Sequence, residues 1–118
     1  MTQRMWWWTS GDAGGGYEKF ILFRWGTLEI SLLKLSEGDE MWEHQDKWPP
    51  YGTDHVFVWY FKRPQKGGRM YTRWHNLKFK FRKKFIYFMP SRIRHGITKV
   101  EVGRGMMLHV KLRTKKFY

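Results

Sequence analysis

The chain contains no cysteine, so disulfide bonds, thiolate metal sites and a cysteine nucleophile are all excluded. No apolar run approaches the roughly 20 residues that a membrane-spanning helix needs. The first residues also lack the basic segment and long apolar stretch of a secretory signal. We therefore expect a cytoplasmic protein without a membrane partner. The length of 118 residues predicts one domain with one core, and the sequence leaves the oligomeric state open.

Acidic residues are nearly absent from the second half of the chain. Residues 55–118 contain eighteen Lys and Arg and a single acid, Glu101, whereas residues 1–54 contain five Lys and Arg and nine acids. The formal net charge of +13 is therefore the sum of −4 and +17 for the two parts. A charge separated in this way favours a polyanion or a small anionic molecule as the binding partner.

Helical periodicity is also absent, since no stretch of ten residues repeats its apolar positions every 3.6 residues. Short β-prone runs between turn residues instead predict strands over residues 28–35, 55–61, 69–74, 77–82 and 85–89, and a hairpin of residues 97–102 and 106–112. This pattern is typical of a small all-β sandwich, barrel or jelly roll, which we place at residues 20–118. The Trp- and Gly-rich residues 1–19 are expected to pack on its core.

Aromatic and cationic side chains alternate along residues 77–82. Alternation in a strand predicts that Phe79 and Phe81 enter the core and that the cations face water. Lys and Arg neutralise phosphates, and an aromatic ring stacks on a base. We therefore predict a surface that binds single-stranded nucleic acid or a nucleotide-like anion, formed by Arg69, Arg73, Trp74, Lys78, Lys80, Arg82, Lys83 and Lys84.

Three residues have the chemistry of an iron site. In a strand, residues i and i+2 point to the same side, so His44 and Asp46 of His44-Gln45-Asp46 can reach one point. A histidine from a distant strand, of which His95 is the candidate, completes the set. Two imidazoles and one carboxylate on one face of Fe(II) leave coordination positions open for a co-substrate and O₂.

The residues around this set resemble the 2-oxoglutarate/Fe(II) oxygenases, in the prolyl 4-hydroxylase-like branch. The similar blocks are the strand, Gly turn and His-x-Asp of residues 32–46, the strand of residues 56–61, the Gly67-Gly68 turn, and the strand and histidine of residues 85–104. The resemblance implies a double-stranded β-helix, which is a jelly roll. It also implies Fe(II) held by His44, Asp46 and His95, with 2-oxoglutarate as co-substrate.

The co-substrate anchor departs from that pattern. The family usually has an Arg or Lys ten residues after the second histidine, whereas this chain has Gly105 there and Arg104 one residue earlier. A shift of one residue turns a side chain to the other face of a strand. We predict that a bulge at Gly103-Arg104-Gly105 corrects the direction and makes Arg104 the anchor. Lys111 and Arg113 are the other cations nearby.

Three functions are compatible with these features. The first is a 2-oxoglutarate- and Fe(II)-dependent hydroxylase of an unidentified substrate, such as a nucleic acid or a nucleotide. The alternative is a non-catalytic basic jelly-roll module that binds or sequesters a nucleotide, a nucleic acid or an acidic protein. A third is a cupin-like metalloenzyme that does not use 2-oxoglutarate.

Overall fold

The computed structural model describes residues 8–11, 13–45, 55–74, 77–89 and 93–112, and every structural statement below refers to these residues. They form strands and no helix, and therefore contain no helix that is long and apolar enough to cross a membrane. The strands are β1 (Trp8–Ser10), β2 (Glu18–Trp25), β3 (Leu28–Leu35), β4 (Met41–His44), β5 (His55–Lys62), β6 (Lys66–Gly67), β7 (Met70–Trp74), β8 (Leu77–Lys80), β9 (Phe85–Phe88), β10 (Arg94–Ile97), β11 (Val100–Val102) and β12 (Gly105–Leu112).

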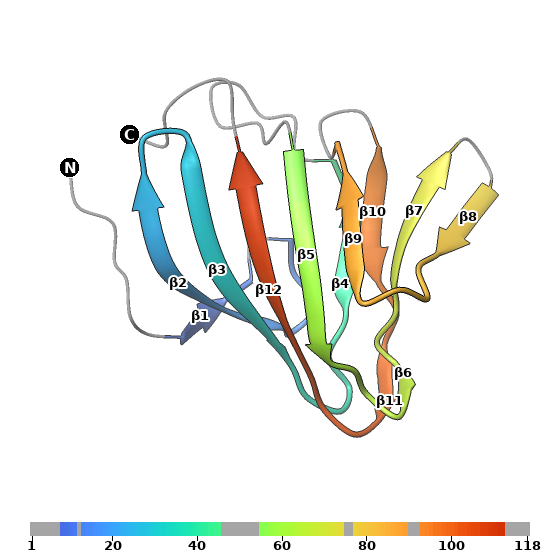
Figure 1. The fold of residues 1–118 in the computed structure, drawn as a ribbon. Helices are drawn as coiled ribbons and strands as arrows, with labels where there is room; N and C mark the ends of the chain where they lie inside the picture. The colour runs from blue at the N-terminus through green and yellow to red at the C-terminus, as the bar shows by residue number, and fades with distance from the viewer. Residues whose placement is uncertain (1–7, 12, 46–54, 75–76, 90–92, 113–118) are drawn as a thin grey trace.

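Two antiparallel sheets face each other across the core (Figure 1). The larger sheet has the strand order β1-β2-β3-β12-β5-β9, and the smaller one has the order β4-β10-β7-β8. The short strands β11 and β6 pair with each other below the smaller sheet in the view of Figure 1. The chain crosses between the sheets several times. As a result, strands that are neighbours in a sheet can be far apart in the sequence, as β12 is from β3. This arrangement is a small jelly roll and confirms the predicted fold class.

Strand alternation builds the core. In β3 every second residue is buried, and the buried side chains of this strand include Leu33 and Leu35. Met107 of β12 lies opposite Leu33 in the register and is also fully buried. The smaller sheet contributes Met70 and Ile97 to the same cluster. Both sheets contribute to one apolar core, and each strand turns its apolar side toward it.

The N-terminal segment continues the larger sheet. Within the part of residues 1–19 that the structure describes, β1 pairs with β2, Tyr17 belongs to the core cluster and Ala13 packs against it. Gly14 lies beneath the ring of Trp42, where a Cβ atom would come within 2.7 Å of that ring. Trp6 and Trp7 are outside the described residues.

Two details of the predicted fold are wrong. Residues 97–102 and 106–112 do not form a hairpin: β11 pairs with β6, whereas β12 pairs with β3 and β5. The Gly103-Arg104 turn carries the chain from the short β11–β6 pair to the larger sheet instead of folding it back onto β11. Phe79 is not in the core either, because it is 53% exposed on the edge strand β8. Phe81 does pack against the core, as predicted.

Charged residues are buried on the inner side of the larger sheet. Glu29 of β3 forms an ion pair with Lys19, whose Nζ is 2.9 Å from the carboxylate Oε1 of Glu29. Both side chains are almost completely buried. Arg24 donates to the second oxygen of the same carboxylate, with its Nε at 2.7 Å. Burial alone would raise the pKa of Glu29, but the charges of Lys19, Lys111 and Arg24 outweigh it and lower the pKa to about 2. Glu29 is therefore ionised in the folded protein at neutral pH.

We predict that Glu29→Gln destabilises the fold by about 3–5 kcal/mol, because it leaves two buried cations without their shared carboxylate. Denaturant unfolding at neutral pH measures this change, and Glu101→Gln is the matched control, since the Glu101 side chain is half exposed and 3.9 Å from Lys66. A loss for Glu29→Gln that is no larger than for Glu101→Gln would contradict the prediction.

The lowered pKa of Glu29 also predicts how the stability of the fold depends on pH. The folded pKa of Glu29 is about 2, below the ordinary value of 4.5. A depressed carboxyl pKa contributes stability above the unfolded pKa and loses it as the pH falls through the folded value. The wild-type protein should therefore lose stability between about pH 4.5 and pH 2. Glu29→Gln should show a shallower loss over that window when both proteins are unfolded by urea at a series of pH values.

Candidate metal centre

Two histidines that are far apart in the sequence lie opposite each other on neighbouring strands. His95 of β10 pairs with His44 of β4, and Ile97 pairs with Met41. Three steps along β4 thus match two steps along β10, which is a β-bulge. Met41 and His44 would point to opposite sides of a regular strand. The bulge turns the imidazole of His44 to the inner side, where Met41 is already buried.

The two rings form a close pair at the interior. Their centroids are 4.2 Å apart, and the ring of Phe88 is 4.8 Å from that of His95. His95 is only 4% exposed, whereas His44 is half-buried. The pair therefore has an apolar wall on the side of β9 and is more open on the side of β4.

Hydrogen bonds fix which nitrogen of each ring can bind a metal. Nδ1 of His44 is 2.8 Å from the carbonyl oxygen of Trp42, and Nδ1 of His95 is 3.2 Å from that of Ile93. A carbonyl oxygen only accepts, so each Nδ1 donates a proton to it. The lone pair of each neutral ring is then on Nε2. A backbone carbonyl that holds Nδ1–H is the usual arrangement for a metal-binding histidine.

The third predicted ligand, Asp46, lies outside the described residues. Among the residues that are described, no group of three or more His, Asp and Glu side chains could hold a metal ion. Glu43, next to His44, faces away: its carboxylate is 2.8 Å from Arg73 and 3.4 Å from Arg94. The hydrogen bond from Arg73, opposed by partial burial, lowers the pKa of Glu43. The two imidazoles nevertheless fit the first two positions of the predicted iron site.

The structure does not bring Arg104 to this pair. Its side chain is exposed in the turn between β11 and β12. Strands β10 and β11 follow each other down the molecule in Figure 1, so the turn lies at the end away from the start of β10, where His95 is. Nine residues of nearly extended chain span on the order of 25 Å. The bulge nearest to this turn is on β5, where three steps from Trp59 to Lys62 match two steps from Leu108 to Met106, and not at Gly103–Gly105.

Polar residues line the inner side of β12 near its other end. The buried positions of this strand are Gly105, Met107 and His109, and Lys111 continues the same side. His109 lies opposite Ser31, whose buried hydroxyl oxygen has no hydrogen-bond partner within the described part of the chain. Lys111 lies opposite Glu29 and helps to lower its pKa. From the sequence, Arg104 is the predicted anchor and Lys111 is one of the other cations; alternation from Met107 places Lys111 on the inner side of β12.

The predicted basic surface is only partly free for a ligand. Five of its cations are exposed: Lys78, Lys80, Arg82, Lys83 and Lys84. The ammonium group of Lys78 lies 4.0 Å from the centre of the Tyr71 ring. Arg73 is engaged by Glu43, and Arg69 donates to the carbonyl oxygens of Pro64 and Gly67 at 3.1 and 3.0 Å. The side chain of Trp74 is outside the described residues.

Comparisons with known proteins support the fold and no closer relationship. No protein-family model matches the chain, and no curated protein matches it either. Among solved structures, a prolyl-4-hydroxylase from Pseudomonas putida is similar, with a TM-score of 0.73 and 10% identity over 90% of this chain and 76% of that one.

Two further solved structures with similar folds come from a cupin protein and from an oxygenase-family protein. A cupin superfamily protein from Desulfitobacterium hafniense has a TM-score of 0.58 and 15% identity over 82% of this chain and 77% of that one. An oxidoreductase of the 2OG-Fe(II) oxygenase family from Burkholderia pseudomallei has a TM-score of 0.63 and 14% identity over 84% of this chain and 46% of that one. Together with the strand order, these neighbours place the chain among the cupin-like jelly rolls, a fold shared by oxygenases and by other proteins.

Proposed function

We propose that this protein is a small Fe(II)- and 2-oxoglutarate-dependent hydroxylase whose metal is held by His44, Asp46 and His95. The observation that carries the proposal is the imidazole pair, with ring centroids 4.2 Å apart and both Nδ1 atoms donating to backbone carbonyls. The similarity to a prolyl-4-hydroxylase structure agrees with it at the level of the fold. Nucleic acids and nucleotides are the first candidates for the hydroxylated substrate, because the chain has a formal net charge of +13.

The residues of the chain have defined tasks in this reaction. Nδ1 hydrogen bonds to the carbonyls of Trp42 and Ile93 orient the two imidazoles before a metal arrives. The ring of Phe88 shields His95 from water, which protects a reactive site from side reactions. When bound, Fe(II) supplies the redox chemistry by which O₂, 2-oxoglutarate and a C–H bond give succinate, CO₂ and an alcohol.

The co-substrate needs a cation inside the barrel, because a buried carboxylate must be paired. We assign this task to Lys111 in place of Arg104. Lys111 lies on the inner side of β12, one residue from the end of that strand, and this end is at the top of the view in Figure 1. His95 is the second residue of β10, which begins at the same end of the molecule. Arg104 is exposed at the opposite end, in the turn that precedes β12.

The metal site is tested by titration with Co(II), whose visible absorption reports on nitrogen ligands. We expect His95→Ala and His44→Ala to weaken Co(II) binding more than roughly 100-fold. Even the loss of a residue that only hydrogen-bonds to a metal ligand lowers metal affinity about 10–100-fold. His55→Ala is the control, since His55 Nδ1 bonds to the Tyr87 hydroxyl at 2.6 Å on the outer side of the sheet. Equal Co(II) affinity in His95→Ala and His55→Ala would refute the site.

The co-substrate anchor is tested by calorimetry of 2-oxoglutarate binding to Mn(II)-loaded protein without oxygen. Lys111→Ala should weaken binding roughly 10–100-fold, the value of a hydrogen bond to a charged group. Arg104→Ala should leave binding within about twofold, because an exposed side chain in solvent gains little from an ion pair. Retained Mn(II) affinity in both variants shows that the site is intact. The opposite ranking would restore Arg104 as the anchor, and no binding to the wild type would exclude 2-oxoglutarate.

A second candidate function is binding of single-stranded nucleic acid at β8 and the loop that follows it. Five exposed cations lie within seven residues there, and Phe79 is exposed between Lys78 and Lys80. Cations that face water can neutralise phosphates, and an exposed ring can stack on a base. This surface could serve a hydroxylase that acts on nucleic acid or a module that only binds it.

Oligonucleotide binding measured at several salt concentrations tests this surface. Five neutralised phosphates predict a slope of log K against log salt of about −3.5 for a single strand. Lys78→Glu with Lys80→Glu should weaken binding of all sequences alike and make the slope shallower. The control is Lys66→Glu with Lys99→Glu, which changes the charge equally at exposed positions outside β8. Equal effects of the two pairs would show that the attraction comes only from the overall charge.

A further inference from the structure

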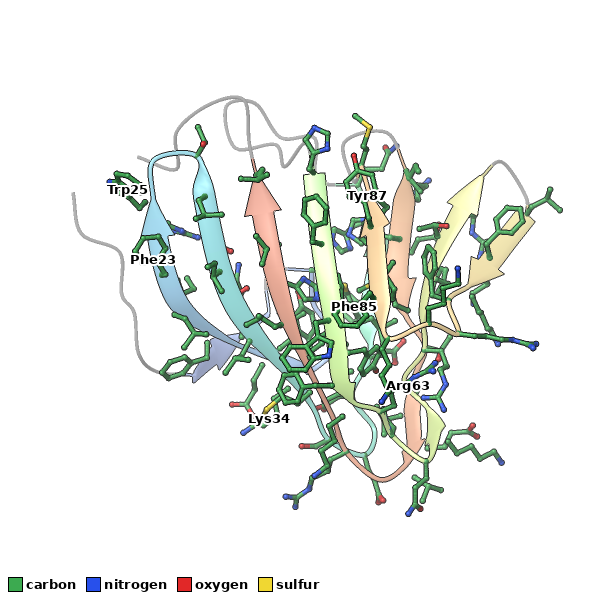
Figure 2. The ribbon with its side chains drawn as sticks, viewed as in Figure 1. Phe23, Trp25, Lys34, Arg63, Phe85 and Tyr87 are labelled. Carbon is green, nitrogen blue, oxygen red and sulfur yellow. The ribbon has the colours of Figure 1, made fainter. Side chains whose placement is uncertain are left out.

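The outer side of the larger sheet is apolar over almost its whole width. We call it the outer face; its side chains alternate with the buried ones along β2, β3, β12, β5 and β9. It comprises Phe20, Phe23, Trp25, Leu28, Ile30, Leu32, Leu108, Val110, Leu112, Phe57, Trp59, Phe61, Phe85 and Tyr87. Figure 2 shows Phe23 and Trp25 at one edge of this face and Phe85 and Tyr87 at the other.

No part of the chain that the structure describes lies over this face (Figure 1). Its aromatic side chains are therefore exposed: Trp59 by 43%, Trp25 by 70% and Phe85 by 71%. Sheets of this kind usually have polar outer residues, because one side of an antiparallel sheet is normally solvated. Apolar patches beyond about 600 Å² are rare on monomers. The outer face thus has the composition of an interface.

The area of the outer face is close to the area that one partner buries in a stable protein complex. Four of its strands are eight residues long and β9 has four. With strands about 4.8 Å apart and about 3.4 Å per residue, these strands cover a flat area of about 600 Å². The accessible area that follows the side chains is larger and approaches the about 800 Å² per partner of a standard interface.

The charges of the molecule allow two such faces to meet. The one lysine of β3 on this side, Lys34, lies at the lower end of the face in Figure 2 and forms an ion pair with Glu18 at 3.2 Å. The exposed cations of residues 78–84 belong to β8 and its following loop, which are outside the larger sheet. Lys62, opposite Met106 at the end of β5, is also exposed, so the lysines of this sheet lie at the rim of the outer face rather than at its centre.

The shape of the face also suits a copy of itself. Twisted sheets pack face to face about 10 Å apart with interdigitating side chains. A groove of about 400 Å³ runs between β12, β5 and β9, lined by Phe57, Trp59, Phe85, Tyr87, Leu108 and Val110. Ridges of exposed aromatic rings border this groove. In a twofold arrangement the ridge of each copy can enter the groove of the other.

We propose that the protein is a homodimer in which the outer faces of two copies pack against each other, with Trp59 and Phe85 at the centre of the contact. This inference is independent of the proposed function, because it rests on the side of the sheet away from the histidine pair. It commits to a second copy of this chain as the occupant. A partner of different sequence would leave the isolated chain monomeric.

Light scattering coupled to size exclusion tests the proposal on the full chain. The wild type should have the mass of two chains of 14.5 kDa at micromolar concentration. Trp59→Glu and Phe85→Glu should each raise the dimer dissociation constant roughly 100-fold or more, because a twofold contact contains every substitution twice. Phe85 is 71% exposed and Trp59 43% exposed on the outer side of the single chain, so neither change should unfold it.

The matched control is Trp42→Glu, the same change at an exposed indole on β4 of the smaller sheet, which should remain a dimer. Circular dichroism verifies that all variants are folded. A monomeric wild type would overturn the proposal, as would a dimer that survives both Trp59→Glu and Phe85→Glu. Dissociation of Trp42→Glu would place the contact on the other sheet and would equally overturn it.

Discussion

The pairing of β10 with β4 is the contact on which the candidate site depends. His95 and His44 face each other only because β4 inserts one extra residue against β10 between Met41 and His44. In a regular ladder His44 would point outward and Glu43 would point inward. Glu43 instead binds Arg73 and Arg94 on the outer side, and this ion pairing supports the bulge from the other face of the sheet. The register, the ion pairs and the imidazole pair are thus one local structure.

The interior of the jelly roll is divided between apolar and polar regions. Leu33, Leu35 and Met107 fill the part where β12 begins, whereas Glu29 and Lys111 lie where β12 ends. A buried carboxylate with three cations around it costs desolvation energy that an apolar residue of similar volume would not. The sequence keeps these charges at the end of the barrel where the histidines lie.

Much of this fold was predictable because alternation is a local signal. Residues 28–35 read as a strand with one apolar side, and β3 has this extent and this pattern of burial. The closeness of His44 and His95 followed from the resemblance to a family and not from spacing alone. The predicted hairpin across Gly103-Arg104-Gly105 failed because a Gly-rich turn has the same local chemistry whether the next strand joins the same sheet or the opposite one. Strand partners are decided by the whole core, which no short window contains.

Two other features could not be read from the sequence for a related reason. Phe79 alternates with lysines as a core residue would, yet β8 is an edge strand and its inner side extends past the opposite sheet. Strand β5 is apolar on both sides, which in a sequence indicates a strand covered on both sides. The structure buries one side within the barrel and leaves the other exposed. Burial on both sides then requires a second molecule, so the same pattern that suggested a central strand supports a dimer once the fold is known.

The histidine pair, the apolar outer face and the exposed cations of β8 lie in three different parts of the molecule. The imidazole pair lies between the sheets, the apolar outer face lies on the far side of the larger sheet, and the exposed cations lie on β8 at the edge of the smaller one. Contact between two outer faces would leave both histidine pairs and both basic edges accessible. The exposed cations of β8 would stay outside such a contact, because β8 does not belong to the larger sheet. Cations on β8 thus permit an association that the same cations on the outer face would oppose.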